Sequence, residues 1–178
     1  IDTLGIINTV SSSIAREADN VLYIKAGAEI SVATTKAYSS QVLMLVLMAL
    51  VMGYTRGVIT KEEANSVIGE INRLPEYVKS IIERKSEFDL VAKSIYEKNN
   101  MFFIGRKIDY ALCMEGSLKL KEISYIHSQS YAAGELKHGT ISLIDKGMPV
   151  ISIVTDETIE EKTISNIKEV KARDAYVV

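Results

Sequence analysis

The stretch from Glu115 to Gly139 holds most of the side chains in this sequence that could do chemistry. Glu115, Lys119 and Glu122 are four and three residues apart, so on a helix all three project from one face. A carboxylate close to an ammonium group suits proton transfer on a small substrate. The alternative is a solvated ion-pair stripe worth about 0.3–0.5 kcal/mol, which spacing alone favours.

Two features of the same stretch argue against a purely solvated stripe. Gly116 and Ser117 are small, so another backbone or a ligand could approach the helix closely there. Apolar residues also flank the charges densely, which indicates a partly dry cleft.

The only two histidines of the chain, His127 and His138, lie in this stretch. His127 follows an apolar run, which favours a hydrogen-bonded structural residue over a catalyst. His138 stands at the end of ELKHG, where a short segment could present it to a cleft and where it could carry a proton near neutral pH. Spacing alone leaves a surface histidine as the default.

A second candidate is the stretch Gly27–Lys36, GAEISVATTK, which reads as a strand-to-helix turn with Thr34 and Thr35 near the helix start. Backbone amides and hydroxyls at such a turn suit a sugar or a phosphate. Simple capping of the helix by one of the threonines is the local alternative and the favoured one.

Composition excludes several classes of function. The net charge of −2, without a dense basic run, gives no electrostatic support for nucleic acid or an anionic membrane as partner. The longest apolar run, Val42–Met52, is shorter than the roughly 20 residues that span a bilayer, and we expect it to be a helix buried in protein. Cys113 is the only cysteine, and its apolar flanks predict an inert packed thiol. No nucleotide or metal motif is present, so the sequence predicts no cofactor and no metal site.

The elements that must position these residues alternate between strand and helix. Apolar runs predict strands at 4–9, 21–25, 101–105, 128–131, 149–154 and 176–178. Helices are expected between them, including one capped by Thr34 or Thr35 and stopped by Gly53, and one opened by a Thr60–Glu63 capping box and kinked or split at Pro75. Continuously apolar strands alternating with helices are typical of an α/β fold with a parallel sheet covered on both faces.

Taken in order, the motifs SSSIAREAD, AGAEISVATTKAYSSQ, GR, EGSLKLKEISYIHSQSYAAGELKHG and MPVI resemble the isomerase half of the glucosamine-6-phosphate synthase family. The resemblance covers nearly the whole chain. It implies a three-layer αβα fold of two partial SIS (sugar isomerase) units, with residues 1–87 as the C-terminal part of the first domain and 88–178 as the N-terminal part of the second. It also implies a cytoplasmic homodimer, with no nucleic acid or membrane as partner.

The resemblance also implies an activity and residue roles. The family converts fructose-6-phosphate and ammonia to glucosamine-6-phosphate, with ammonia supplied by a glutaminase domain of the same parent chain. By this resemblance Glu122 moves the proton between C1 and C2, Lys119 belongs to the same site, and His138 opens the sugar ring from the neighbouring subunit. Val32, Ala33 and Thr34 match a stretch that contacts the sugar.

Several departures from the family pattern bear on activity. Lys107 stands where the family usually has glycine, and Thr140 where it usually has proline. The family's phosphate loop, C-terminal tail and glutaminase domain fall outside these 178 residues, so we expect the chain alone to be poorly active. The competing class is a non-enzymatic SIS module that senses a sugar phosphate, and a third is a structural fragment. The combination of Glu122, Lys119 and His138 favours the enzyme.

Overall fold

The computed structural model describes all 178 residues, which divide into two compact units, residues 1–84 and 85–178. Strands alternate with helices in both units, and every strand pair is parallel. The predicted α/β parallel-sheet class is therefore confirmed. The assignment of 1–87 and 88–178 to parts of two successive SIS domains stays a prediction.

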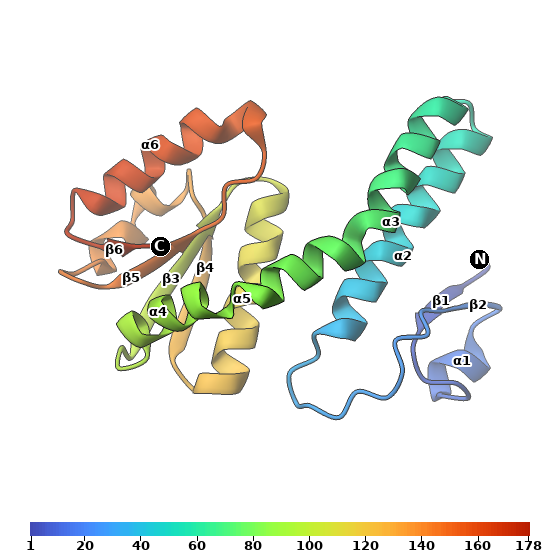
Figure 1. The fold of residues 1–178 in the computed structure, drawn as a ribbon, viewed down its shortest axis with the longest axis horizontal. Coiled ribbons are helices and arrows are strands. Elements are labelled where there is room, and N and C mark those ends of the chain that lie inside the picture. Colours follow the sequence, from blue (N-terminus) through green and yellow to red (C-terminus); the bar gives the residue numbers. More distant parts are fainter. The chain divides into compact units, whose positions relative to one another are not determined.

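The first unit is small, with a two-stranded sheet and three helices (Figure 1). Its elements are β1 (Leu4–Ile7), α1 (Ser13–Glu17), β2 (Asn20–Tyr23), α2 (Lys36–Thr55) and α3 (Lys61–Glu83). α2 and α3 run antiparallel to each other (Figure 1). The predicted capping box at the start of α3 is present: the backbone amide of Thr60 donates to the Glu63 carboxylate, and the backbone amide of Glu63 donates to the Thr60 hydroxyl.

The second unit contains a four-stranded sheet in the order β4-β3-β5-β6. Its main elements are α4 (Lys85–Ile95), β3 (Asn100–Gly105), α5 (Ile108–Ser124), β4 (His127–Ala132), β5 (Pro149–Ser152), α6 (Glu160–Lys171) and β6 (Tyr176–Val177). The short 3₁₀ turns η1 (Leu136–His138), η2 (Thr140–Leu143) and η3 (Glu157–Ile159) lie in the connections.

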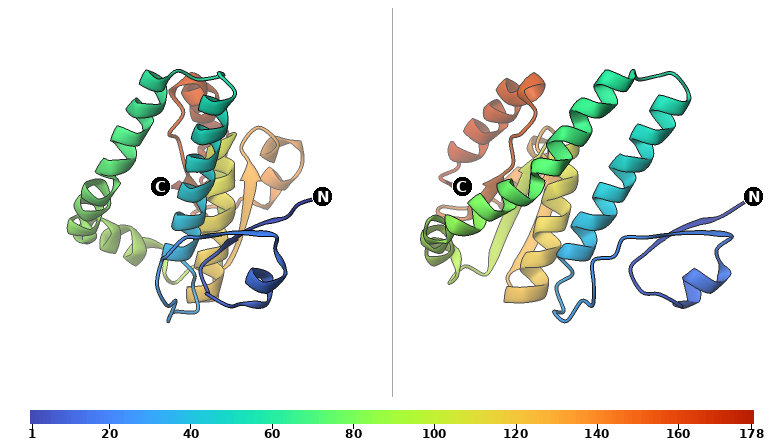
Figure 2. Two further views of the ribbon diagram at one scale, coloured as in Figure 1. Left: turned by 90° about the vertical axis from the view of Figure 1, so that its right-hand side faces the viewer. Right: turned by 45° about the vertical axis from the view of Figure 1, so that its right-hand side comes forward.

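Successive residues of β3 point to opposite faces of this sheet and feed two separate cores. Phe102 and Ile104 pack with Val170 of α6 on one face, whereas Met101 and Phe103 pack with Cys113 of α5 on the other. Figure 2 shows α5 and α6 on opposite sides of the strands. Because both faces are covered, β3 reads as the continuously apolar run MFFIG.

The structure corrects three expectations about α2. The helix continues through Gly53 and ends at Thr55, because Gly57 rather than Gly53 takes the left-handed conformation that closes a helix. It is 20 residues long, and by length and composition alone it could cross a membrane. It is also not buried: only Ala37 is inaccessible, because the first unit offers few other elements to cover an apolar helix.

Pro75 does not split α3 into two helices. The helix is assigned without a break from Lys61 to Glu83 with Pro75 inside it, and a bend is visible along it in Figure 1. A proline inside a helix removes one backbone hydrogen bond and crowds the preceding turn, which explains a bend.

Candidate functional site

The predicted charged stripe exists on α5 and is partly buried. The Lys119 ammonium lies 2.6 Å from Glu122 Oε2 and 3.5 Å from Glu115 Oε1. The side chains of Lys119, Glu115 and Glu122 are 18%, 22% and 29% exposed. An exposed ion-pair stripe would leave such long side chains mostly in water, so the structure favours the partly dry alternative.

Electrostatics within the stripe keep Lys119 charged. The hydrogen bond from the Lys119 ammonium to Glu122 raises the pKa of the lysine; desolvation opposes it as the next largest effect, and the charges of Glu122 and Glu115 add smaller upward contributions. Lys119 therefore remains a cation at neutral pH. Its ammonium is shared between the carboxyl groups of Glu115 and Glu122, and only Oε2 of Glu122 takes part, so Glu122 Oε1 keeps its acceptor capacity.

The small residues Gly116 and Ser117 let α5 pack closely on the sheet of the same unit. A Cβ added at Gly116 would lie 3.1 Å from Cε1 of Phe103 in β3. Ser117 is buried and lies 2.9 Å, Oγ to Oγ, from Ser128 of β4, whose hydroxyl also donates to the Ser117 carbonyl. The expectation that another backbone approaches the helix closely at these positions is confirmed, because β3 and β4 pack against them. These strands fill that space, so the alternative of a ligand there is not supported. The hydroxyl pair instead sets the position of α5 on the sheet.

His138 lies at the end of η1 with its side chain exposed and without a hydrogen-bond partner. The segment that carries it is fixed by Ala133 and Leu136, which are both almost fully buried. No hydrogen bond or ion pair joins His138 to Glu122 or Lys119. The structure therefore brings Lys119 and Glu122 together within one chain and leaves His138 apart from them.

The sequence analysis missed the interaction of Arg106 with Asn166, which lies beside Gly134 at the start of the segment that carries His138. Arg106, directly after β3, donates from Nε and Nη2 to Oδ1 of the buried Asn166 in α6, at 3.1 and 2.8 Å. The guanidinium group passes so close to Gly134 that an added Cβ would lie 2.8 Å from Nη2. Glycine therefore fits position 134 without a shift of the Arg106 guanidinium, whereas any larger residue would displace it. The only sequence signal was the spacing of GR and AAGELKHG, which gives no hint of their contact.

The Val32–Thr34 stretch lies in the first unit, in the loop between β2 and α2. Val32 and Thr34 are exposed, whereas Ala33 is buried. The N-cap of α2 is Thr35, and its side chain makes no capping hydrogen bond. Thr34 is therefore not a helix cap, and its hydroxyl has no partner within the chain.

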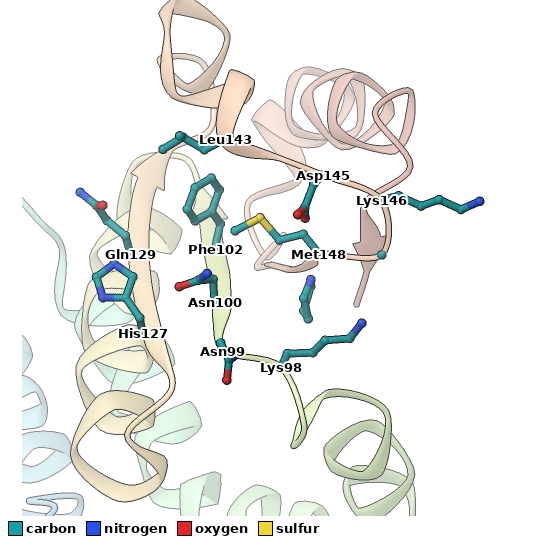
Figure 3. A pocket seen from close by; sticks show the side chains of 12 residues that line it. Lys98, Asn99, Asn100, Phe102, His127, Gln129, Leu143, Asp145, Lys146 and Met148 are labelled. Carbon is teal, nitrogen blue, oxygen red and sulfur yellow. The ribbon is translucent and has the colours of Figure 1, made fainter.

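A hollow of about 440 Å³ in the second unit has none of these residues in its lining. It opens at the amino ends of β3, β4 and β5, where His127 and Gln129 project from one strand and Phe102 from the next (Figure 3). The His127 side chain is exposed and makes no hydrogen bond, so the expectation of a hydrogen-bonded structural histidine is wrong. None of Glu115, Lys119, Glu122 and His138 lines this hollow.

Comparison with known proteins assigns the family. The model of the SIS domain matches residues 1–51 and 94–178, which is more than half of the chain. The chain belongs to the SIS domain family. The gap in the match spans the end of α2, all of α3 and most of α4, so these helices lie between the two matched parts of the SIS fold.

The individual relatives belong to a narrower group of proteins than the SIS domain family as a whole. Glutamine--fructose-6-phosphate aminotransferases [isomerizing] of Caldanaerobacter subterraneus subsp. tengcongensis and Fusobacterium nucleatum are 49% and 52% identical to the chain over 98% and 99% of its length. The chain spans 29% of each of these relatives. Among solved structures, the C-terminal domain of glucosamine-fructose-6-phosphate aminotransferase from Francisella tularensis superposes with a TM-score of 0.96 and 36% identity, over 99% of this chain and 50% of that one. The resemblance predicted from the motifs is thereby confirmed.

Proposed function

We propose that this chain is part of the isomerase portion of a glutamine–fructose-6-phosphate aminotransferase, which converts fructose-6-phosphate and ammonia to glucosamine-6-phosphate. The observation that carries the proposal is the partly buried Glu115–Lys119–Glu122 stripe, in a chain about half identical to enzymes of that name. The ammonia would come from a glutaminase domain of the parent protein, and the enzyme would be cytoplasmic.

Each residue of the stripe has a role that its chemistry supports. Moving a proton between C1 and C2 of an open sugar needs a base beside the carbon and an electrophile at the oxygen. Glu122 is the base in this proposal, and the Lys119 ammonium, 2.6 Å away, stabilises the negative charge that develops on the substrate oxygen. Val32, Ala33 and Thr34 contact the sugar, with the unpartnered Thr34 hydroxyl as hydrogen-bonding group.

The variant Glu122→Gln tests the catalytic base. Placed in a full-length aminotransferase that carries this segment, it should lower the isomerase rate by about 10²–10⁴-fold, because the amide cannot accept the proton. Glutamine hydrolysis and sugar-phosphate binding should survive. The control Glu157→Gln changes an exposed carboxylate of η3 and should leave the rate unchanged. Near-normal transfer of the C1 proton to C2 in Glu122→Gln would remove Glu122 from the mechanism and favour a non-catalytic sugar-phosphate module.

The separation of His138 from Glu122 supports a homodimer in which His138 opens the ring at the neighbouring subunit's site. Apolar side chains exposed on α2, such as Leu45 and Val51, are surface that a second subunit could cover.

Mixing two inactive full-length variants, Glu122→Gln and His138→Asn, tests this arrangement. Each mixed dimer would keep one intact site, so about a quarter of the wild-type activity should return for a symmetric dimer after subunit exchange. If both residues act within one chain, no activity returns. A fully active monomer in sedimentation equilibrium would also refute the dimer.

A further inference from the structure

A second hollow, of about 290 Å³, lies wholly within the second unit at the carboxyl ends of its strands. Arg106 and Lys107 border it after β3, Gly134 and Glu135 after β4, and Lys162 in the first turn of α6. Three cations and one carboxylate thus line a cavity at the edge where open parallel sheets bind ligands.

This hollow is separate from the Glu122 stripe in the same chain. Lys107 immediately precedes α5, whereas Glu122 lies near the other end of that helix. At 1.5 Å per residue, the 14 residues between Ile108 and Glu122 place the two features about 20 Å apart. A ligand in the hollow would therefore not touch Glu122 of its own chain.

Lys107 occupies a backbone conformation that favours glycine. Its φ is 51° and its ψ is −121°, and Asp109 N donates to Arg106 O at 3.0 Å, so Lys107 is the first central residue of a type II′ turn. A lysine there strains the backbone, and strain of this kind concentrates at ligand sites. Its ammonium lies 3.1 Å from the partly buried Asp156 and 3.3 Å from the hydroxyl of the exposed Thr158, both on the β5–α6 connection.

The other two cations keep unused donors. The Arg106 guanidinium is anchored by Asn166 through Nε and Nη2, and Nη1 makes no hydrogen bond within the chain. Lys162 has neither an ion pair nor a hydrogen bond. Because Asp156 partly neutralises Lys107, these two groups supply most of the positive potential, opposed by Glu135 at the rim. An anchored guanidinium beside mobile ammonium groups suits an oxyanion with several acceptor oxygens.

We propose that this hollow binds the phosphate group of a small phosphorylated metabolite, held by Arg106, Lys107 and Lys162. The site is independent of the proposed isomerase activity, and Lys107, where the sequence pattern leads one to expect glycine, is its distinguishing residue.

Lys107→Gly separates this proposal from a purely structural role of the lysine. Glycine relieves the strained turn, which outweighs the loss of an ion pair whose lysine side chain is 60% exposed, so the melting temperature should rise by about 2–4 °C. The same change should weaken binding of inorganic phosphate to the 178-residue chain on the order of tenfold, measured by calorimetric titration at low ionic strength. A more stable protein that binds the anion less well is the expected outcome.

A second pair of variants keeps the turn intact. Lys162→Gln should lower phosphate affinity by several-fold, whereas Lys168→Gln, an exposed lysine on the same helix outside the hollow, should not. Equal losses for both variants would mean that net charge alone attracts the anion. Absence of saturable phosphate binding to the wild-type chain, or unchanged affinity in Lys107→Gly, would overturn the proposal.

Discussion

Gly134→Ala should destabilise the second unit through Arg106. An added methyl group would lie 2.8 Å from Nη2, 3.3 Å from Cζ and 3.4 Å from Nη1 of Arg106, so the guanidinium must move. That movement breaks two hydrogen bonds to Oδ1 of Asn166, at 2.8 and 3.1 Å, on a side chain that is 4% exposed. A buried acceptor without its donor costs about 1–3 kcal/mol.

The net effect is smaller because alanine restricts the unfolded chain. That restriction stabilises the folded state by about 0.4–1 kcal/mol where the backbone conformation suits alanine. We therefore expect the free energy of unfolding to fall by about 1–2 kcal/mol, with a melting temperature lower by about 2–8 °C. Urea denaturation followed by circular dichroism at 222 nm measures the change. Gly69→Ala is the control, because nothing lies within 4 Å of its added Cβ inside α3 and it should stabilise by about 0.5–1 kcal/mol.

A double-mutant cycle with Arg106→Ala decides whether the guanidinium is the cause. Without the Arg106 side chain the three nearest atoms to the methyl group at position 134 are gone, so Gly134→Ala should become nearly neutral in that background. The coupling free energy should then be about 1 kcal/mol or more. Additive effects within about 0.5 kcal/mol would refute the reasoning, as would a Gly134→Ala protein as stable as the wild type.

Three further predictions follow from local contacts. Thr60→Ala removes one half of the capping box of α3 and should lower the free energy of unfolding by about 1 kcal/mol in urea denaturation. Thr34→Val should leave the melting temperature almost unchanged, because Thr35 is the N-cap, and should weaken fructose-6-phosphate binding in a full-length aminotransferase that carries this segment; a loss of stability without a loss of affinity would contradict it. Burial raises the pKa of Cys113 to about 11, so the native thiol should resist iodoacetamide at pH 8.5 until denaturant is added. Because the unfolded thiol ionises first, stability should fall as the pH rises from about 9 to about 11, and Cys113→Ala should remove that part of the loss.

Local sequence patterns determined the elements of this protein and the stripe on α5. A run such as MFFIG is apolar at every position because both faces of β3 are covered, so the run itself predicts a central parallel strand. Glu115, Lys119 and Glu122 share a face through helical periodicity alone, and the capping box needs only residues 60–63. These features depend on neighbours within about one helical turn, which a sequence displays directly.

Tertiary structure alone decided which of these features are buried and what they contact. Arg106 meets Asn166 across 60 residues and approaches Gly134 from another strand, and Ser117 pairs with Ser128 across a turn; no periodicity encodes such pairs. The end of α2 was missed because Gly53 and Gly57 look alike in the sequence, whereas only Gly57 adopts a positive φ. A residue's conformation and burial depend on elements that fold back from elsewhere in the chain. The sequence could therefore nominate Glu122 and Lys119, but only the three-dimensional structure shows that their side chains lie partly out of water.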